Sequence, residues 1–504
     1  MNSNIERKKG IILSYVSIIL NCVIQLLYTP LLVRKLGQSE YGLYSLVSSI
    51  IGYLTMLDLG FGNAIIVYTA KYRAKNLKKE EEKLHGMFKI IFISLGLFSM
   101  LLSLILFFTA DKIFSATMTN VEIAKFKKML LILAFNLLIT FSFNIYNSII
   151  SAYEKFTYQK VMSIISTIIK PLIMIPLLCH GYKSITLCII ITIVNVAVLI
   201  SNYIYCKRTL NVKVKYLGFD KKVLATVLGY SIWIFLGIIV DKINWSLDQF
   251  ILGVVSGTTA VSIYSIASTI NQLFINLSVA VSNVFLVKMS QMVSKKAYIE
   301  ELTSEFIKIG RIQYYIIFFM CSCLILFGKE LIFMWVGNDF EESYYVSLLL
   351  ILPVCIPLIQ NLGLSIIQAL NKYKFKAISS IIMAIINGIV SIFLAKKLGA
   401  IGAALGTCIS LIVCNVIVMN IYYYKKIKLN IALFWKNIAK MTFIFLIPLS
   451  IIIVIINIIK SQKAPMIIMY VIIYATIYFF ISYKYVMNNY EKGLIKKMIF
   501  NRKE

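Results

Sequence analysis

Apolar segments of about 20 residues recur along almost the whole chain, and they constrain its fold more than any other feature. A bilayer core is about 30 Å thick, and an α-helix of about 20 apolar residues crosses it. Hydrophobic residues make up 60% of the 504 residues and charged residues only 14%, a balance that no soluble domain of this length has. The chain is therefore predicted to cross a membrane many times.

We predict an all-α polytopic membrane protein with about fourteen transmembrane helices. The first apolar run is too long for a signal peptide, and no small-residue cleavage site follows it, so it is interpreted as a retained helix. The loops are short, and no G-x-x-x-x-G-K-[ST] phosphate loop is present. The predicted helices lie near 11–33, 41–69, 88–109, 128–150, 161–179, 186–205, 223–245, 250–287, 309–328, 346–369, 377–395, 400–424, 438–459 and 464–483.

The chain also contains an internal repeat. Residues Gly37–Val67 match Gly257–Val287 at a constant offset, and residues 152–171 match 369–388 at a similar one. Apolar residues match by chance in a membrane protein, so the glycine, tyrosine, asparagine and lysine pairs are the more informative evidence for the repeat. These pairs are Gly37/Gly257, Tyr44/Tyr264, Asn63/Asn283 and Lys155/Lys372.

The repeat predicts three parts: an N-terminal lobe of six helices at 1–210, a second such lobe at 211–430, and two extra helices with a cytoplasmic tail at 431–504. Six helices separate the repeats, so both lobes keep the same orientation and an axis along the membrane normal should relate them. Transporters build a cavity between two such lobes, whereas a membrane enzyme has no need of this symmetry. The pattern therefore favours transport.

Lysine and arginine residues give the chain a net charge of +30. They lie mostly in short loops between apolar runs, which indicates membrane orientation rather than nucleic-acid binding. Their bias predicts that both termini and the loop Lys71–Lys89 are cytoplasmic, while the outer loop Lys329–Tyr345 is an acidic exception. Nine scattered cysteines and two histidines have no zinc-site spacing, so we predict no metal site and no cofactor.

Three segments carry a resemblance to a known family. They are Leu31–Tyr44 (LLVRKLGQSEYGLY), Leu57–Asn63 (LDLGFGN), and Asp248–Gly253 (DQFILG) followed by Tyr264. Along its whole length the chain resembles the Wzx-type polysaccharide-transport flippases of the MOP superfamily, which are relatives of the MATE drug exporters.

The resemblance implies a flippase that moves undecaprenyl-diphosphate-linked oligosaccharide repeat units across the bacterial cytoplasmic membrane. It implies alternating access, cationic residues in a central cavity, and a role in capsule, O-antigen or cell-wall polymer assembly. Glycosyltransferases and a polymerase of the same pathway would be partners.

Three alternatives remain open at this point. A MATE-type exporter of cationic drugs would need an anionic cavity. A polytopic glycosyltransferase, polymerase or ligase would need catalytic acids or bases and a larger extramembrane loop. A non-transporting scaffold for wall assembly would differ only in lacking transport activity.

Charges inside membrane helices are costly, about 2.5–3.5 kcal/mol each on insertion scales, so they are the first candidates for function. Lys170 lies roughly 14 Å into its predicted helix, near the midplane, and Pro171 follows it. Its repeat partner is Asn387. We predict that Lys170 binds the anionic headgroup of a substrate; the alternative is that it neutralises Asp58. Asp58 itself is a candidate for lining the substrate cavity and for ion coupling, and the alternative is an ion pair or a helix-capping acceptor.

Further candidates lie on the seventh helix and among the amides. Asp241 and Asp248 are candidates for ion coupling, and Lys242 for substrate binding, with an interfacial belt as the alternative. A cavity for sugars needs neutral donors and acceptors, although interhelical hydrogen bonding explains many such residues. The amides predicted to line the cavity, besides Asn387, are Asn63, Asn271, Asn276 and Asn283.

Overall fold

The computed structural model describes residues 2–58, 60–216, 218–220, 224, 247–294, 298–370, 372–459 and 464–500. All regular elements in these ranges are helices, as expected for a chain in lipid, where every backbone hydrogen bond must be made internally. Eleven of these helices are long and apolar enough to cross a membrane. The prediction of an all-α polytopic membrane protein is confirmed. The number fourteen stays a prediction, since all of the seventh predicted helix except residue 224 lies outside the described residues.

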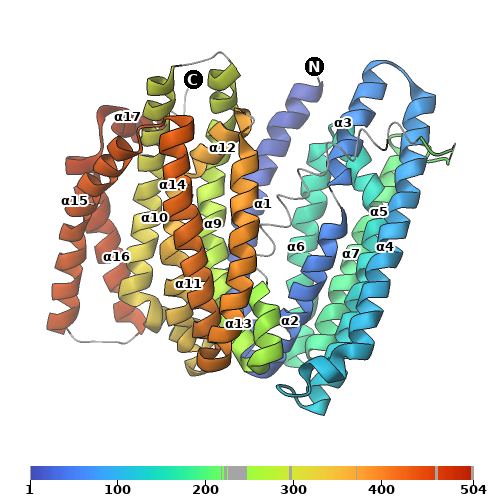
Figure 1. Cartoon of the computed structure of the whole chain (residues 1–504), viewed down its shortest axis with the longest axis horizontal. Coiled ribbons are helices and arrows are strands. Elements are labelled where there is room, and N and C mark those ends of the chain that lie inside the picture. The colour runs from blue at the N-terminus through green and yellow to red at the C-terminus, as the bar shows by residue number, and fades with distance from the viewer. Residues whose placement is uncertain are drawn as a thin grey trace. The chain divides into compact units, whose positions relative to one another are not determined.

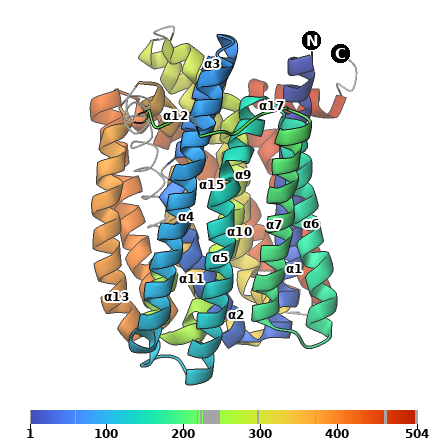
Figure 2. The ribbon, with the colours of Figure 1, turned by 90° about the vertical axis from the view of Figure 1, so that its right-hand side faces the viewer.

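Residues 1–265 and 388–403 form one compact unit. Within it, α4, α5 and α7 run side by side, and α1 packs along α6 (Figures 1 and 2). The elements of this unit are α1 (Asn2–Leu36), α2 (Gln38–Leu54), the 3₁₀ turn η1 (Thr55–Asp58), α3 (Phe61–Ala74), α4 (Lys78–Phe114), α5 (Asn120–Ala152), α6 (Phe156–Cys179) and α7 (Ser184–Arg208).

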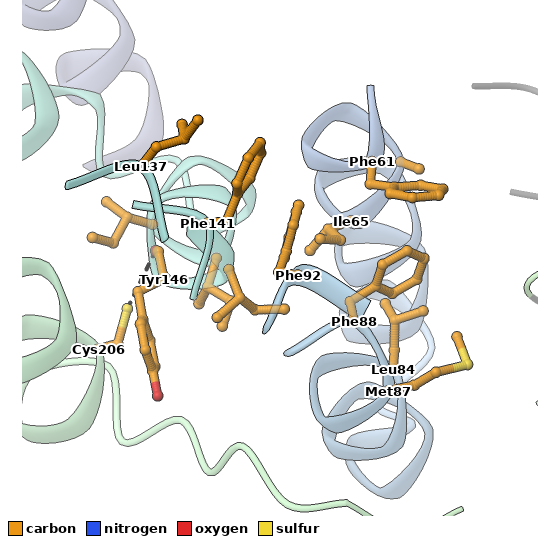
Figure 3. Packing of buried hydrophobic residues seen from close by; sticks show 14 residues of the cluster. Phe61, Ile65, Leu84, Met87, Phe88, Phe92, Leu137, Phe141, Tyr146 and Cys206 are labelled. Carbon is orange, nitrogen blue, oxygen red and sulfur yellow. Dashed lines mark hydrogen bonds between the residues drawn. The ribbon is translucent and has the colours of Figure 1, made fainter. Parts of the chain in front are cut away.

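The core of this unit lies between α3, α4 and α5. Phe61 of α3 and Phe88 of α4 meet edge to face with ring centroids 5.5 Å apart. Phe92 and Phe141 continue the cluster toward α5, and all four side chains are buried (Figure 3). Aromatic edge-to-face pairs add about 0.5–1.5 kcal/mol beyond their buried area, so this cluster fixes α3 against α4.

The second predicted helix, 41–69, is not continuous. It ends as α2 at Leu54, passes through the 3₁₀ turn, and resumes as α3 at Phe61. Gly60 adopts a φ of 72°, in the left-handed region that favours glycine. The prediction of one helix over 41–69 is therefore wrong at this point, because the 3₁₀ turn and the left-handed Gly60 interrupt it.

Residues 266–387 and 404–504 form the second compact unit. In it, α10 packs against α11, α15 and α16 (Figure 1). The elements that contribute to this unit are α9 (Gly257–Ser294), α10 (Ile299–Val336), the 3₁₀ turn η2 (Asn338–Phe340), α11 (Glu342–Ile359), α12 (Asn361–Ala369), α13 (Tyr373–Leu411), the π-helix η3 (Ile412–Val418), α14 (Met419–Tyr422), the π-helix η4 (Tyr423–Ile427), α15 (Ile431–Ile459), α16 (Ala464–Ile481), the π-helix η5 (Ser482–Val486) and α17 (Asn489–Phe500).

The element α13 is two helices joined at a sharp turn. Gly399 interrupts it with φ 56° and ψ −133°. Two hydrogen bonds join the arms. Ser391 Oγ donates to the Ala403 carbonyl at 3.3 Å, and farther from the turn on both arms, Ser410 Oγ donates to the Met383 carbonyl at 3.1 Å. The two arms are therefore antiparallel, in agreement with separate helices predicted at 377–395 and 400–424.

Backbone geometry matches at repeat partners. Gly37 has a φ of 83° and directly precedes α2, while Gly257 has a φ of 85° and is the first residue of α9. Asn211 and Lys428, which correspond at the second offset, have φ values of 52° and 65°. This geometry agrees with an internal repeat, while the domain boundaries given above stay predictions.

The C-terminal helix α17 is attached to α10 by a buried ion pair. Arg311 donates through Nε and Nη2 to both Glu491 oxygens, at 2.7 and 3.0 Å. Tyr315 and the Asn488 backbone N–H also donate to this carboxylate. Burial raises the pKa of Glu491, but these hydrogen bonds lower it more, so the net shift is downward.

We therefore expect Arg311→Met to lower the melting temperature of the purified protein sharply. Breaking a buried pair by removing one partner costs about 3–5 kcal/mol, because the other charge stays buried. The double change Arg311→Met with Glu491→Met should recover most of the loss, since no unpaired charge remains. Thermal unfolding in detergent measures both, and equal melting temperatures for the single and double variants would contradict the expectation.

Candidate functional site

The break between α2 and α3 holds an acidic side chain. Asp58 ends the 3₁₀ turn, and its Oδ1 accepts a hydrogen bond from Asn144 Nδ2 at 3.1 Å. The backbone N–H of Gly62, in the first turn of α3, also donates to this carboxylate. A negative charge at a helix N-terminus is favourable, so Asp58 caps α3 inside the membrane-spanning segment.

Asn144 belongs to a row of polar residues on α5, which we call the α5 polar ladder. Its hydrogen bonds connect three helices: Asn195 of α7 donates to Asn136 and Thr140 at 2.7 and 2.8 Å, and Gln159 of α6 donates to Ser151 at 2.7 Å. The ladder extends about 22 Å at 1.5 Å per residue. It offers neutral donors and acceptors with Asp58 beside its middle. The ladder consists of Asn136, Thr140, Asn144, Asn147, Ser148 and Ser151.

Lys170 lies within α6 and is half-buried. No hydrogen bond or ion pair joins its ammonium to another residue in the part of the chain that the structure describes. One turn earlier, Thr167 Oγ1 contacts Asn21 Oδ1 of α1 at 3.5 Å. Residues three apart share a helix face, so Lys170 lies on the side of α6 that turns toward α1. Lys170 is not among the partners of Asp58, which are Asn144 and the backbone of Gly62.

The other predicted residues are distributed over several elements. Asn63 is exposed on α3. On α9, Asn271 is buried and Asn276 accepts a hydrogen bond from Gln272 at 2.9 Å. Asn283 also lies on α9, but its side chain is outside the described part, as are Asp241 and Lys242.

Two predicted residues are engaged in hydrogen bonds within their own units. Asn387 is buried between the arms of α13, where its Nδ2 donates to Thr407 Oγ1 at 3.0 Å. Asp248 is buried and accepts a hydrogen bond from Tyr264. Asn387, the repeat partner of Lys170, thus joins two helices, and the two positions differ in their contacts as well as in charge.

The beginning of α9 lies in direct contact with α2. A Cβ added to Gly42 would come within 1.8 Å of the Thr258 carbonyl oxygen, so only glycine allows this approach. Ser265 Oγ donates to Ser45 Oγ at 3.0 Å, and these two serines are repeat partners. Nearby, Glu122 of α5 accepts hydrogen bonds from Ser39 and Thr258. The contact therefore joins equivalent positions of the two repeats.

We expect Asn144→Ala to destabilise the first unit. It removes a hydrogen bond to a partly buried charge, worth about 1.5–3 kcal/mol. Asn147→Ala, on the same helix but with an exposed side chain, is the matched control and should have a smaller effect. Melting temperatures in one detergent compare the two, and a larger loss for Asn147→Ala would contradict the role given to Asp58 as a cap held by Asn144.

The ladder is not among the predicted cavity residues, although the sequence carries a signal for it. Asn136, Thr140, Asn144 and Ser148 are spaced four residues apart in an apolar helix, which places them on one face.

Comparisons with known proteins agree with this architecture. A family model described as "Polysaccharide biosynthesis protein" matches residues 8–292. A protein of Shigella flexneri named "Putative O-antigen transporter" is 20% identical over 398 residues, which cover 78% of this chain and 91% of that protein.

Two solved structures share the fold. The lipid II flippase MurJ in an inward closed conformation aligns with a TM-score of 0.72 and 20% identity, covering 96% of this chain and 99% of that one. An inward-facing MATE multidrug transporter of the MOP superfamily aligns with a TM-score of 0.59 and 14% identity, covering 80% and 99%. These relatives are transporters and flippases, in agreement with the prediction of a transport protein rather than an enzyme.

Proposed function

The chain belongs to the polysaccharide biosynthesis protein family, and we propose that it is a flippase for undecaprenyl-diphosphate-linked oligosaccharide repeat units. The observation that carries the proposal is the alignment with a lipid II flippase over 96% of the chain, together with a named O-antigen transporter as a sequence relative. In this proposal the protein acts in the bacterial cytoplasmic membrane with both termini inside. It supplies repeat units for capsule, O-antigen or cell-wall polymers.

We propose that Lys170 binds the negatively charged group of the substrate. Its ammonium has no partner among the described residues, and a cation within the membrane is costly unless a partner or ligand meets it. The diphosphate of the substrate would be the anionic partner of this ammonium. Because a diphosphate is also costly to place in lipid, it does not cross the membrane by simple diffusion. Asp58, Asp241 and Asp248 remain the candidates for coupling an ion, and the amides of α3, α9 and α13 the candidates for contacting sugars.

Alternating access would use the contact of α2 with the start of α9. Gly42 and the pair Ser45 and Ser265 bring equivalent positions of the repeats together, which is where two lobes that rock about a common axis would close. Transport then requires this contact to open and close in each cycle.

A MATE-type drug exporter is the second candidate, favoured by the structural likeness to MATE transporters. A cationic drug would be repelled by Lys170, whereas an anionic headgroup would be attracted. The smaller coverage of the MATE alignment, 80% of this chain against 96%, also favours the flippase.

Deletion of the gene in its own host tests the proposal. Lipid-linked repeat units should accumulate in the inner leaflet and surface polymer should disappear, while drug susceptibility stays unchanged. Normal polymer with increased drug susceptibility would favour the exporter instead.

A separate labelling experiment tests the orientation. Cysteines placed at both termini and in the loop Lys71–Lys89 should react with maleimide only after permeabilisation.

A further inference from the structure

A polar cavity of about 790 Å³ lies in the first unit, at the end that carries the N-terminus. Its walls come from the start of α1, the end of α3, the first turns of α4, the connection between α5 and α6, and residues 210–213 after α7. Binding sites for small molecules usually measure about 300–1,000 Å³, so the cavity has the size of a ligand site. The α5 polar ladder ends at Ser151, directly before the wall residue Ala152.

Helix ends create this hollow. Asn76 follows α3 with a φ of 56°, and Glu154 follows α5 with a φ of 57°. In each case the next residue donates its N–H back into the helix: Leu77 to the Tyr72 carbonyl at 3.0 Å, and Lys155 to the Ile150 carbonyl at 3.1 Å. These left-handed C-terminal caps turn the chain away at once and leave space between the helices.

The walls of the cavity are held rigidly. The Arg73 guanidinium lies 3.6 Å from the Tyr153 ring centroid and donates to the Ala152 carbonyl at 3.0 Å. The Tyr153 hydroxyl donates to Glu81 at 2.9 Å. The segment after α7, which forms another wall, packs closely on α4. A Cβ added to Gly86 of α4 would lie 2.0 Å from the Lys215 carbonyl oxygen. A preorganised site loses less entropy when a ligand binds.

A buried histidine in the wall, His85, has one ring nitrogen without a hydrogen-bond partner among the described residues. His85 is fully buried, and its Nε2 is 2.9 Å from Thr69 Oγ1. Its Nδ1 has no partner among the described residues, although His85 lies on the face of α4 that lines the cavity. A buried polar atom without a partner is costly, about 1–3 kcal/mol, and such atoms are uncommon in native proteins.

The charges of the cavity indicate its ligand. Four glutamates and four lysine or arginine residues line it, so a diphosphate would meet as many carboxylates as cations. A neutral polyhydroxylated ligand fits this balance, because each hydroxyl both donates to a carboxylate and accepts from a cation or amide. Among the lining groups, Lys78 and Glu82 come from the first turns of α4 and Lys213 from the segment after α7, and Asn76 and Asn211 add side-chain amides.

We propose that this cavity is an additional binding site for the uncharged glycan of the substrate, separate from the diphosphate contact assigned to Lys170 and from the candidate sugar contacts at the amides of α3, α9 and α13. The proposal rests on the proposed function for the identity of the glycan. Binding there would place the sugar beside residues 210–213, which lead from the first lobe to the rest of the chain.

The test uses the full-length protein in lipid nanodiscs and two probes. One is the oligosaccharide released by mild acid from the host's own lipid-linked intermediates, and the other is undecaprenyl diphosphate without sugar. In hydrogen–deuterium exchange, the free oligosaccharide should slow exchange at 74–82, 152–158 and 210–213. Undecaprenyl diphosphate should leave these segments unchanged. Slowing by the sugar-free lipid, or no slowing by the oligosaccharide, would overturn the proposal.

Glu82→Gln should weaken oligosaccharide binding in calorimetry about tenfold or more, since a charged acceptor becomes a neutral amide. Glu80→Gln is the matched control, because Glu80 is exposed in the same first turns and does not line the cavity. Equal affinities for both variants would also overturn the site. If the wild-type protein does not flip the intact lipid-linked substrate, the proposed function fails; if it does flip it but the cavity shows no protection, only this inference fails.

Discussion

Replacing Lys170 by alanine should abolish polymer export while the protein remains folded and inserted. Lys170 is half-buried in α6 and pairs with no described residue, so its loss leaves no orphaned partner that would unfold the protein. In our account the ammonium meets the substrate's diphosphate, and without it that anion enters the membrane interior unpaired. Export is measured as surface polymer, and protein level and melting temperature are measured in parallel.

Two companion variants separate this role from a structural one. Lys170→Arg should retain part of the activity, because the charge is kept but the geometry changes. Adding Asp58→Ala to Lys170→Ala should not restore export, since Asp58 is held by Asn144 and by the N-terminus of α3. Restored export in that double variant would show that Lys170 only neutralises Asp58, and the substrate role would be abandoned.

Linking Ser45 to Ser265 should stop transport reversibly. Their oxygens are 3.0 Å apart, so cysteines at both positions, in a background without other cysteines, are close enough to form a disulfide or accept a short cross-linker. If α2 and the start of α9 must separate in each cycle, oxidation should reduce export to background and a reducing agent should restore it. Polymer export and cross-linking on denaturing gels measure the two events together.

The single variants Ser45→Cys and Ser265→Cys, treated with the same oxidant, control for damage and should export normally. Full export by a fully cross-linked double variant would contradict alternating access at this contact.

Much of the fold was predictable because lipid imposes simple rules. Apolar length located the helices, and the repeat partners Gly37 and Gly257 indeed share a left-handed φ at the start of a helix. The turn at Gly399 was predicted as a gap between two helices. In each case a local physical requirement, either burial in lipid or a positive φ, is visible in the residues themselves.

The rest depended on tertiary contacts. The helix break at Gly60 follows from Asp58 capping α3, which requires Asn144 from a distant helix. Asn387 was predicted to line a cavity, but its amide is bonded to Thr407, a partner that only the hairpin brings close. The cavity proposed to bind the glycan lies where several helix ends meet, so no single segment of the sequence predicts it.

Flipping by the purified protein tests the central claim most directly. Proteoliposomes would contain the host's lipid-linked oligosaccharide, labelled on the sugar, and an enzyme or lectin outside would report which leaflet exposes it. The wild-type protein should move the labelled lipid between leaflets much faster than protein-free liposomes, and Lys170→Ala should not. Movement no faster than in protein-free liposomes, with correctly inserted protein and an imposed proton or sodium gradient, would contradict the account.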